Sequence, residues 1–151
     1  MNLRSIRDSS ELLTRLSNTE LEFFESVSRE THLANGQILF EEGGPADSFF
    51  IVSKGKIGLE MTSPGMAAMV IQTLGPGDLV GVSCFFPPHR WNWRARAMED
   101  TDLIVFDAVE VRRMCDVNRD LALEVLGVVA EEVVRRLHGT RIQLLDLYRS
   151  T

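Results

Sequence analysis

The chain has 151 residues, of which 44% are hydrophobic and 25% are charged, and its formal net charge is −6. This length and composition fit a single globular domain whose core can fold without metal ions or disulfides. The negative charge argues against direct DNA binding, because nonspecific affinity for nucleic acids comes from lysine and arginine contacts to phosphates.

The sequence contains no targeting or membrane segment that we can recognise. The first residues, MNLRSIRDSSELL, are too polar for a signal peptide, and the most apolar later run, residues 121–130, contains Glu124. We therefore expect a cytoplasmic protein. The cysteines Cys84 and Cys115 do not form a CxxC motif, and we expect both to be reduced thiols.

Residues 1–35 are predicted to form short amphipathic helices. Ser17 and Glu20 have the spacing of a capping box, in which the serine hydroxyl accepts an amide N–H and the glutamate binds back to the serine amide. Leu21 and Phe24 follow at helical spacing, so a helix is expected to begin there.

Residues 36–107 change to short β-rich runs that are separated by turn residues. Evenly spaced short strands of this kind predict an antiparallel sandwich or a closed barrel rather than a parallel sheet. The runs are QILFEEGG, SFFIVSKG, KIGLEMTSPG, MVIQTLGPG, WRARAMED and TDLIVFD.

Residues 108–151 are predicted to form two helices, the first capped by Asp107 with Glu110 and the second, long one by Asn118. For residues 121–129 the spacing leaves open whether the apolar stripe packs on the barrel or on a second copy. The rest of the helix extends beyond what a small barrel can cover, so we expect a homodimer there. The expected dimer residues are Val133, Leu137, Thr140, Leu144 and Leu147.

Turn glycines recur in a fixed order along the β region, and positive φ is expected where strands reverse at Gly36, Gly43 and Gly55. With the residues between them, these glycines form ordered motifs: Gly36-Gln-Ile-Leu39-Phe40, Gly43, residues 46–52 (ADSFFIV), Lys54-Gly55, Ile57 and residues 74–81 (LGPGDLVG). The order of motifs resembles the cyclic nucleotide-binding domain of the catabolite-activator and anaerobic-regulator (Crp/Fnr) superfamily.

The resemblance implies a single α+β, mainly β domain over residues 1–151. Its parts would be the N-terminal helices, a jelly-roll barrel over residues 36–107 and a long C-terminal dimerisation helix within residues 108–151. The family's regulators continue after that helix into a helix-turn-helix domain, and this chain stops at Thr151, so the resemblance implies no direct binding to DNA.

The resemblance also places the family's phosphate-binding cassette at residues 81–92. The usual cassette begins Phe-Gly-Glu, with the glutamate on the ribose hydroxyl, and ends in an arginine and a Ser or Thr that hold the phosphate. Here Val82 follows the glycine, and the loss of a charge-assisted hydrogen bond would cost about 1.5–3 kcal/mol of cyclic-nucleotide binding. The candidate ligand-binding residues are Gly81, Val82, Ser83, Cys84, Arg90, Trp91 and Asn92.

The place of the anion-binding arginine stays open. Trp91 and Asn92 stand at the family's Arg and Ser/Thr positions, and Arg90 is one residue short. If a strand begins near Arg90, the alternation of side chains along it places Trp91 and Trp93 on the inner face and the arginines on the outer face. If instead Pro87-Pro88 keep Arg90 in the loop before the strand, Arg90 could reach an anion.

Two residue types in the cassette have alternative roles. Trp91 and Trp93 could stack on a planar ligand, although filling the barrel is the interpretation that we favour. Cys84, at the expected start of the cassette helix, could be a reactive thiolate, but packing as a small buried residue is favoured.

No catalytic or metal motif is recognisable. The histidines His32, His89 and His138 are isolated, whereas a metal-binding barrel enzyme would need a cluster of His and Glu ligands. There is also no Ser/His/Asp order and no GxxxxGK[ST] loop. We therefore expect neither an enzyme nor a metal site.

Two functions are consistent with these observations. The first is a non-enzymatic sensory module that binds a cyclic nucleotide or another anionic small molecule and signals through a C-terminal helix dimer. The alternative is a ligand-free scaffold that docks protein partners, including a DNA-binding relative. The absent cassette glutamate favours the scaffold, whereas the retained turn at residues 75–81 and the nearby Arg90 favour sensing.

Overall fold

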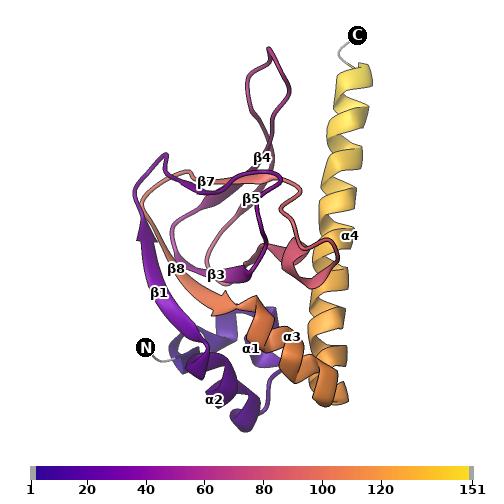
Figure 1. Ribbon diagram of the computed structural model, residues 1–151. Coiled ribbons are helices and arrows are strands. Elements are labelled where there is room, and N and C mark those ends of the chain that lie inside the picture. Colours follow the sequence, from indigo (N-terminus) through magenta and orange to yellow (C-terminus); the bar gives the residue numbers. More distant parts are fainter. Residues whose placement is uncertain (1–2, 150–151) are drawn as a thin grey trace.

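The computed structural model describes residues 3–149, so the expected domain limits at residues 1 and 151 lie outside the described part of the chain (Figure 1). Helices stand at both ends of this part, and one short helix interrupts the β region. In chain order the helices are η1 (Leu3–Ser5), η2 (Arg7–Ser9), α1 (Glu11–Thr14), α2 (Asn18–Ser26), η3 (Val82–Phe85), α3 (Ala108–Val117) and α4 (Arg119–Arg149).

The strands form two four-stranded sheets with the orders β1-β8-β3-β6 and β2-β7-β4-β5, and all pairings are antiparallel. The mainly β, α+β fold predicted from the sequence is confirmed, and each of the six predicted runs contains a strand. The strands are β1 (Ser28–Leu33), β2 (Ile38–Phe40), β3 (Ser48–Lys54), β4 (Ile57–Met61), β5 (Met69–Leu74), β6 (Leu79–Val80), β7 (Arg94–Ala97) and β8 (Thr101–Asp107).

The expectation that residues 1–35 contain only helices is wrong at its end, because β1 covers Ser28–Leu33. This strand pairs along its length with β8, from Ser28 opposite Phe106 to Leu33 opposite Thr101. Its sequence, SRETHL, is mostly polar and only Leu33 is buried. An edge strand held by backbone hydrogen bonds lacks the apolar alternation by which a strand is recognised from sequence.

The predicted capping residues Ser17, Asp107 and Asn118 are confirmed, but Glu110 does not complete a capping box with Asp107, because its carboxylate pairs with Arg113 and the Asp107 amide donates to the carbonyl of Val27. The amide of Ser17 donates to Glu20 Oε1 over 2.9 Å, and the amide of Glu20 donates to Ser17 Oγ over 3.2 Å. The Asp107 carboxylate accepts from the amides at the start of α3, and Asn118 Oδ1 accepts from the amide of Leu121 in α4. These contacts satisfy amides that the first helical turns leave without a partner.

Aromatic side chains in the core join the N-terminal helices to the β structure. Phe49 of β3 and Phe106 of β8 stack with ring centroids 4.8 Å apart, and Phe24 of α2 meets Phe106 edge to face at 5.8 Å. All three rings are fully buried. The sheet and the helix α2 therefore share one hydrophobic core.

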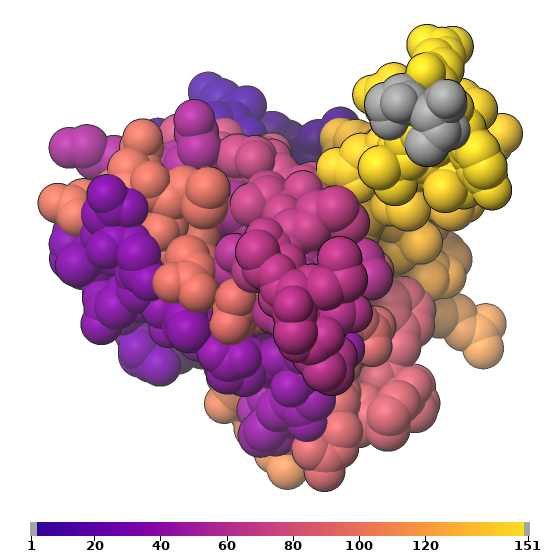
Figure 2. Space-filling view, turned by 90° about the horizontal axis from the view of Figure 1, so that it is seen from above, coloured from indigo at the N-terminus to yellow at the C-terminus, as the bar shows by residue number. Residues whose placement is uncertain are grey.

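The open question about residues 121–129 is answered by burial, since Leu121, Val125, Val128 and Val129 all lie in the core. This half of α4 therefore packs on its own domain. Beyond it, the helix continues along the side of the β structure, as Figure 1 shows, and its far end projects beside the β4–β5 hairpin in the view of Figure 2. No helix within residues 3–149 is both long and apolar enough to cross a bilayer.

The turn before β6 brings the chain into close contact with η2. Gly77 has φ +88°, and a Cβ atom at this position would overlap the carbonyl group of Ser9. Gly36 has a similar φ of +86°, but a Cβ atom there would meet nothing within 4 Å. The two glycines therefore share a backbone requirement and differ in their surroundings.

We predict that Gly77→Ala lowers the free energy of unfolding more than Gly36→Ala does. Both alanines would carry the cost of a left-handed conformation, about 1–2 kcal/mol. Only Gly77→Ala would also overpack the contact with η2, which adds roughly 1–3 kcal/mol. Urea denaturation of both variants measures the difference, and equal losses would contradict the close approach.

Candidate ligand groove between η3 and α4

The segment expected to be the cassette begins with a glycine that makes room for a tryptophan. Gly81 precedes η3 and has φ +92°, and a Cβ atom there would lie 2.9 Å from the ring of Trp91. Trp91 is 6% exposed and stacks on Phe40 with centroids 3.8 Å apart. Trp91 therefore fills the core beneath η3, in agreement with the interpretation favoured from the sequence.

The loop after η3 is fixed by contacts to one carbonyl oxygen. The guanidinium of Arg112 in α3 donates to the carbonyl of Cys84, and His89 Nδ1 lies 3.0 Å from the same oxygen. His89 itself has a φ of +57°. These contacts hold the chain on its way from η3 to Trp91, and so they position the side chains on either side of the loop.

A groove of about 460 Å³ lies between this segment and α4. Its volume falls in the range of small-molecule sites, and its walls are mostly apolar. The residues that line it are Val82, Ser83, Phe86, Asn92 and Trp93 from the cassette side and Val133, Arg136, Leu137 and Thr140 from α4.

Arg136 is the only charged residue among those that line the groove. Its side chain is only 10% exposed, and its Nε donates to Gln72 Oε1 over 2.8 Å. Its Nη2 is buried without a hydrogen-bond partner among the described residues, and the nearest carboxylate oxygen, Glu132 Oε1, is 3.6 Å away. Burial lowers the pKa of Arg136 from its ordinary value, and the charge of Glu132 opposes this shift.

A polar cluster ties α4 to β5 beside the groove. Gln72 of β5 donates through Nε2 to Glu132 Oε1 over 3.0 Å, and Arg135 lies 3.2 Å from Glu132 Oε2. Glu132 is itself 4% exposed. The position of Arg136 is therefore set by both elements, by its own helix and by the glutamine of the sheet.

The structure brings some of the sequence-predicted ligand residues to the groove and leaves others outside. Val82, Ser83 and Asn92 line it, and Asn92 Nδ2 donates to Ser83 Oγ over 3.3 Å. Gly81 and Cys84, like Trp91, are buried and absent from the groove lining. Three residues expected at the dimer seam, Val133, Leu137 and Thr140, also face this groove.

Arg90, the candidate anion-binding residue of the sequence, does not line the groove. Its side chain is exposed, and its Nη1 donates to the carbonyl of Gly43 over 2.9 Å. The strand begins at Arg94 rather than near Arg90, and Arg90 forms only an isolated bridge with Pro45. Arg90 therefore lies in the loop before the strand, as the second alternative requires, but its side chain contacts Gly43 and does not reach this groove.

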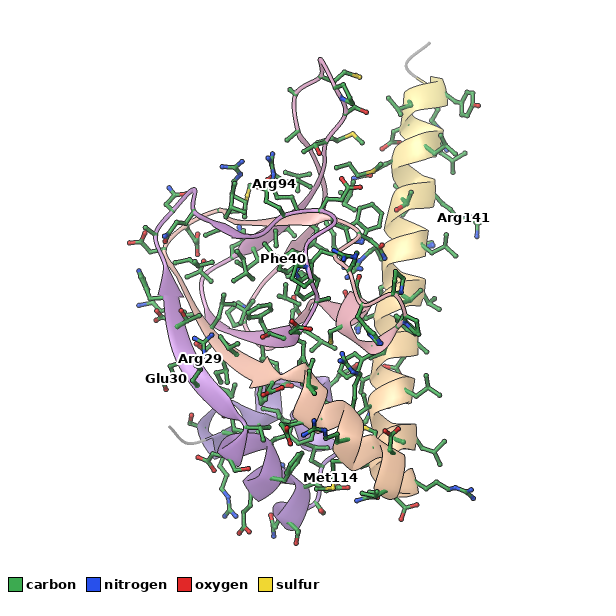
Figure 3. The ribbon with its side chains drawn as sticks, in the orientation of Figure 1. Arg29, Glu30, Phe40, Arg94, Met114 and Arg141 are labelled. Atoms are coloured by element: carbon green, nitrogen blue, oxygen red, sulfur yellow. The ribbon has the colours of Figure 1, made fainter. Side chains whose placement is uncertain are left out.

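The predicted alternation of inward and outward side chains is found within β7. Ala95 and Ala97 are fully buried, whereas Arg94 and Arg96 lie on the other face. Both arginines pair through Nε with Glu60 Oε1, at 3.2 and 2.9 Å, and Figure 3 shows Arg94 on this outer surface. These arginines are therefore engaged on the opposite face of the sheet from the core.

The family model described as "Cyclic nucleotide-binding domain" matches residues 30–118. The chain belongs to this family. The "CRP-like cAMP-activated global transcriptional regulator" of Mycobacterium tuberculosis (strain CDC 1551 / Oshkosh) is 26% identical over 112 residues, which are 74% of this chain and 48% of the relative. The chain thus spans about half the length of this Crp-like relative.

Solved structures agree with this family assignment. The N-terminal domain of a transcriptional regulator from Streptomyces coelicolor A3(2) is 26% identical, with a TM-score of 0.69 over 92% of this chain and 94% of that one. The catabolite activator protein of Thermus thermophilus, 24% identical, aligns with a TM-score of 0.71 over 92% of this chain and 63% of that one. At this identity the second comparison supports the fold alone.

In this cyclic nucleotide-binding domain, the segment expected to be the cassette begins with the short 3-10 helix η3, and the buried thiol of Cys84 in this helix is not activated. Cys84 is fully buried, and burial raises the pKa of its thiol far above the ordinary value, with a smaller opposing effect from Arg112. The packing role favoured for Cys84 agrees with this environment. Within residues 3–149, no group of three or more His, Cys, Asp and Glu side chains could hold a metal ion.

We predict that Cys84 resists alkylation in the folded protein, whereas Cys115, which is partly exposed, reacts. The neutral, buried thiol of Cys84 offers neither a thiolate nor access to a reagent at pH 8. Iodoacetamide labelling followed by mass spectrometry should modify the wild type once and the Cys115→Ser variant not at all. In urea both cysteines should react, and fast native labelling of Cys115→Ser would contradict the prediction.

Proposed function

We propose that this domain is a non-enzymatic sensor that binds an anionic small molecule in the groove between η3 and α4 and signals through α4. The observation that carries this proposal is the guanidinium of Arg136, which is buried at a mostly apolar groove and has one nitrogen without a hydrogen-bond partner among the described residues. A buried polar group in this condition loses about 1–3 kcal/mol relative to one that is paired. A bound anion would remove that penalty.

The two walls of the groove explain how such binding could be transmitted. Val82 and Asn92 belong to the cassette segment, whereas Val133 and Leu137 belong to α4. A ligand that contacts both walls favours the arrangement in which they are correctly spaced. Binding acts as a switch only if the ligand has different affinities for two arrangements of the helix and the barrel.

We also propose that α4 forms a homodimer seam. Apolar residues follow its outer side at steps of three and four, and several large ones are more than half exposed, including Leu126, Val134 and Leu145. Leu144 and Leu147, which the sequence assigned to the seam, are 53% and 61% exposed. An exposed apolar face of this length is typical of a surface that a second helix covers.

We predict that anionic ligands stabilise the domain through Arg136 and not through Arg90. A thermal-shift panel of cyclic AMP, cyclic GMP and organic carboxylates should contain ligands that raise the Tm of the wild type. At a concentration a hundred times Kd, the stabilisation is about 2.7 kcal/mol. Arg136→Met should lose this effect because the cation is removed, whereas Arg90→Ala should keep it.

The converse pattern, in which Arg90→Ala loses the response and Arg136→Met retains it, would contradict the role of Arg136. If no anion in the panel changes the Tm of the wild type, the sensor proposal fails, and the ligand-free scaffold becomes the better interpretation.

We predict that Val134→Asp and Leu144→Asp each convert a dimer to a monomer, since a carboxylate would be placed in an apolar helix contact. Sedimentation equilibrium measures the mass. Val117→Asp is the matched control, because Val117 is 82% exposed but ends α3 and lies outside the proposed seam. A dimer that survives both α4 substitutions would place the contact elsewhere.

A further inference from the structure

We propose that the ligand of this groove is an amphipathic monoanion, a carboxylate with an aromatic or alkyl body, rather than a cyclic nucleotide. This inference rests on the proposed function and specifies the chemical class that the groove accepts.

The charge of the site fits one carboxylate. Arg136 Nη2 has no hydrogen-bond partner among the described residues, and a carboxylate oxygen is a strong acceptor for it. Glu132, with a side chain 6% exposed and Oε1 3.6 Å from the same nitrogen, repels a second negative charge in the same place. A ligand with a single charge is therefore favoured over a dianion such as a phosphate monoester.

The groove offers few polar groups to a sugar or a base. Asn92 donates to Ser83 across the groove wall, and the hydroxyl of Thr140 donates to the carbonyl of Arg136. No Asp or Glu lines the groove, and the side chain of Val82 accepts no hydrogen bond, so a ribose hydroxyl would find no charged acceptor. Polar groups of a ligand that enter a site without partners lose the hydrogen bonds they had in water.

The walls of the groove suit an apolar body. Phe86, Trp93 and Val82 form one side, and Val133 and Leu137 face them from α4. Phe86 is 44% exposed and Leu137 is 59% exposed, so a ligand between them would remove apolar surface from water. Removal of apolar surface from water stabilises the complex by about 25 cal/mol for each Å² buried. An aromatic ring or an alkyl chain fills such a space without needing hydrogen bonds.

The test compares matched ligands by isothermal titration calorimetry on the full chain. The probes are 1-naphthylacetate and decanoate, the neutral 1-naphthylacetamide, and cyclic AMP with cyclic GMP. We expect the carboxylates to bind, the amide to bind at least about tenfold more weakly because it cannot pair with the guanidinium, and the cyclic nucleotides to bind more weakly than the carboxylates.

Substitutions of arginine residues test whether the ligand carboxylate contacts Arg136. Arg136→Met should weaken naphthylacetate binding at least about tenfold, and Arg136→Lys, which keeps the charge, should weaken it less. Arg141→Met is the matched control, because Arg141 is exposed on the same helix and points away from the barrel in Figure 3. This control should bind like the wild type. Circular dichroism shows whether each variant is folded.

The outcomes separate this inference from the function on which it rests. Cyclic nucleotides that bind more tightly than the carboxylates would overturn the ligand class and leave the sensor intact. Equal binding of the carboxylate and its amide, or unchanged binding by folded Arg136→Met, would overturn the role of the charge. Failure of all anions to bind would overturn the sensor itself.

Discussion

The packing of α4 on the barrel is the constraint on which the candidate site depends. Its first half is held by buried apolar residues such as Leu121 and Val125, a contact that does not depend on a ligand. Its middle is held by polar contacts, with Gln72 between Glu132 and Arg136. The groove exists because the helix lies beside η3 at this point. Any change in the angle of α4 would therefore change the width of the groove and the place of its arginine together.

Much of the fold could be predicted from local patterns because those patterns act over short distances. The capping box at Ser17 and the positive φ at Gly36 follow from a few neighbouring residues, and both are found. The strand β1 could not be predicted, since its polar residues are ordered by pairing with β8, far along the chain. Local chemistry thus identified most of the elements, whereas β1 and the two-residue strand β6 lie outside the predicted strand runs and depend on pairing with β8 and β3.

The position of the candidate groove could be predicted from the sequence, but the charged residue that lines it could not. The turn glycines pointed to residues 81–92 as the candidate cassette, and Val82 of this segment lines the groove. Arg90 was the natural candidate because it is close in sequence, yet its donor is used by the carbonyl of Gly43. Arg136 lies far from the cassette in sequence, and an arginine in a long helix ordinarily faces water. Only the tertiary packing of α4 against β5 shows that this one is buried.

The arrangement of faces on α4 bears on how binding and assembly could be coupled. One side of the helix, with Val128, is buried in the domain, the adjoining side contributes Leu137 to the groove, and the next carries exposed residues such as Val134. A ligand that fixes the helix against the cassette also fixes the orientation of the neighbouring face. If a second copy binds that face, the ligand and the partner act on one rigid element, and each changes the affinity of the domain for the other by the same factor. The coupling then requires no path through the barrel, because both contacts are made by a single helix.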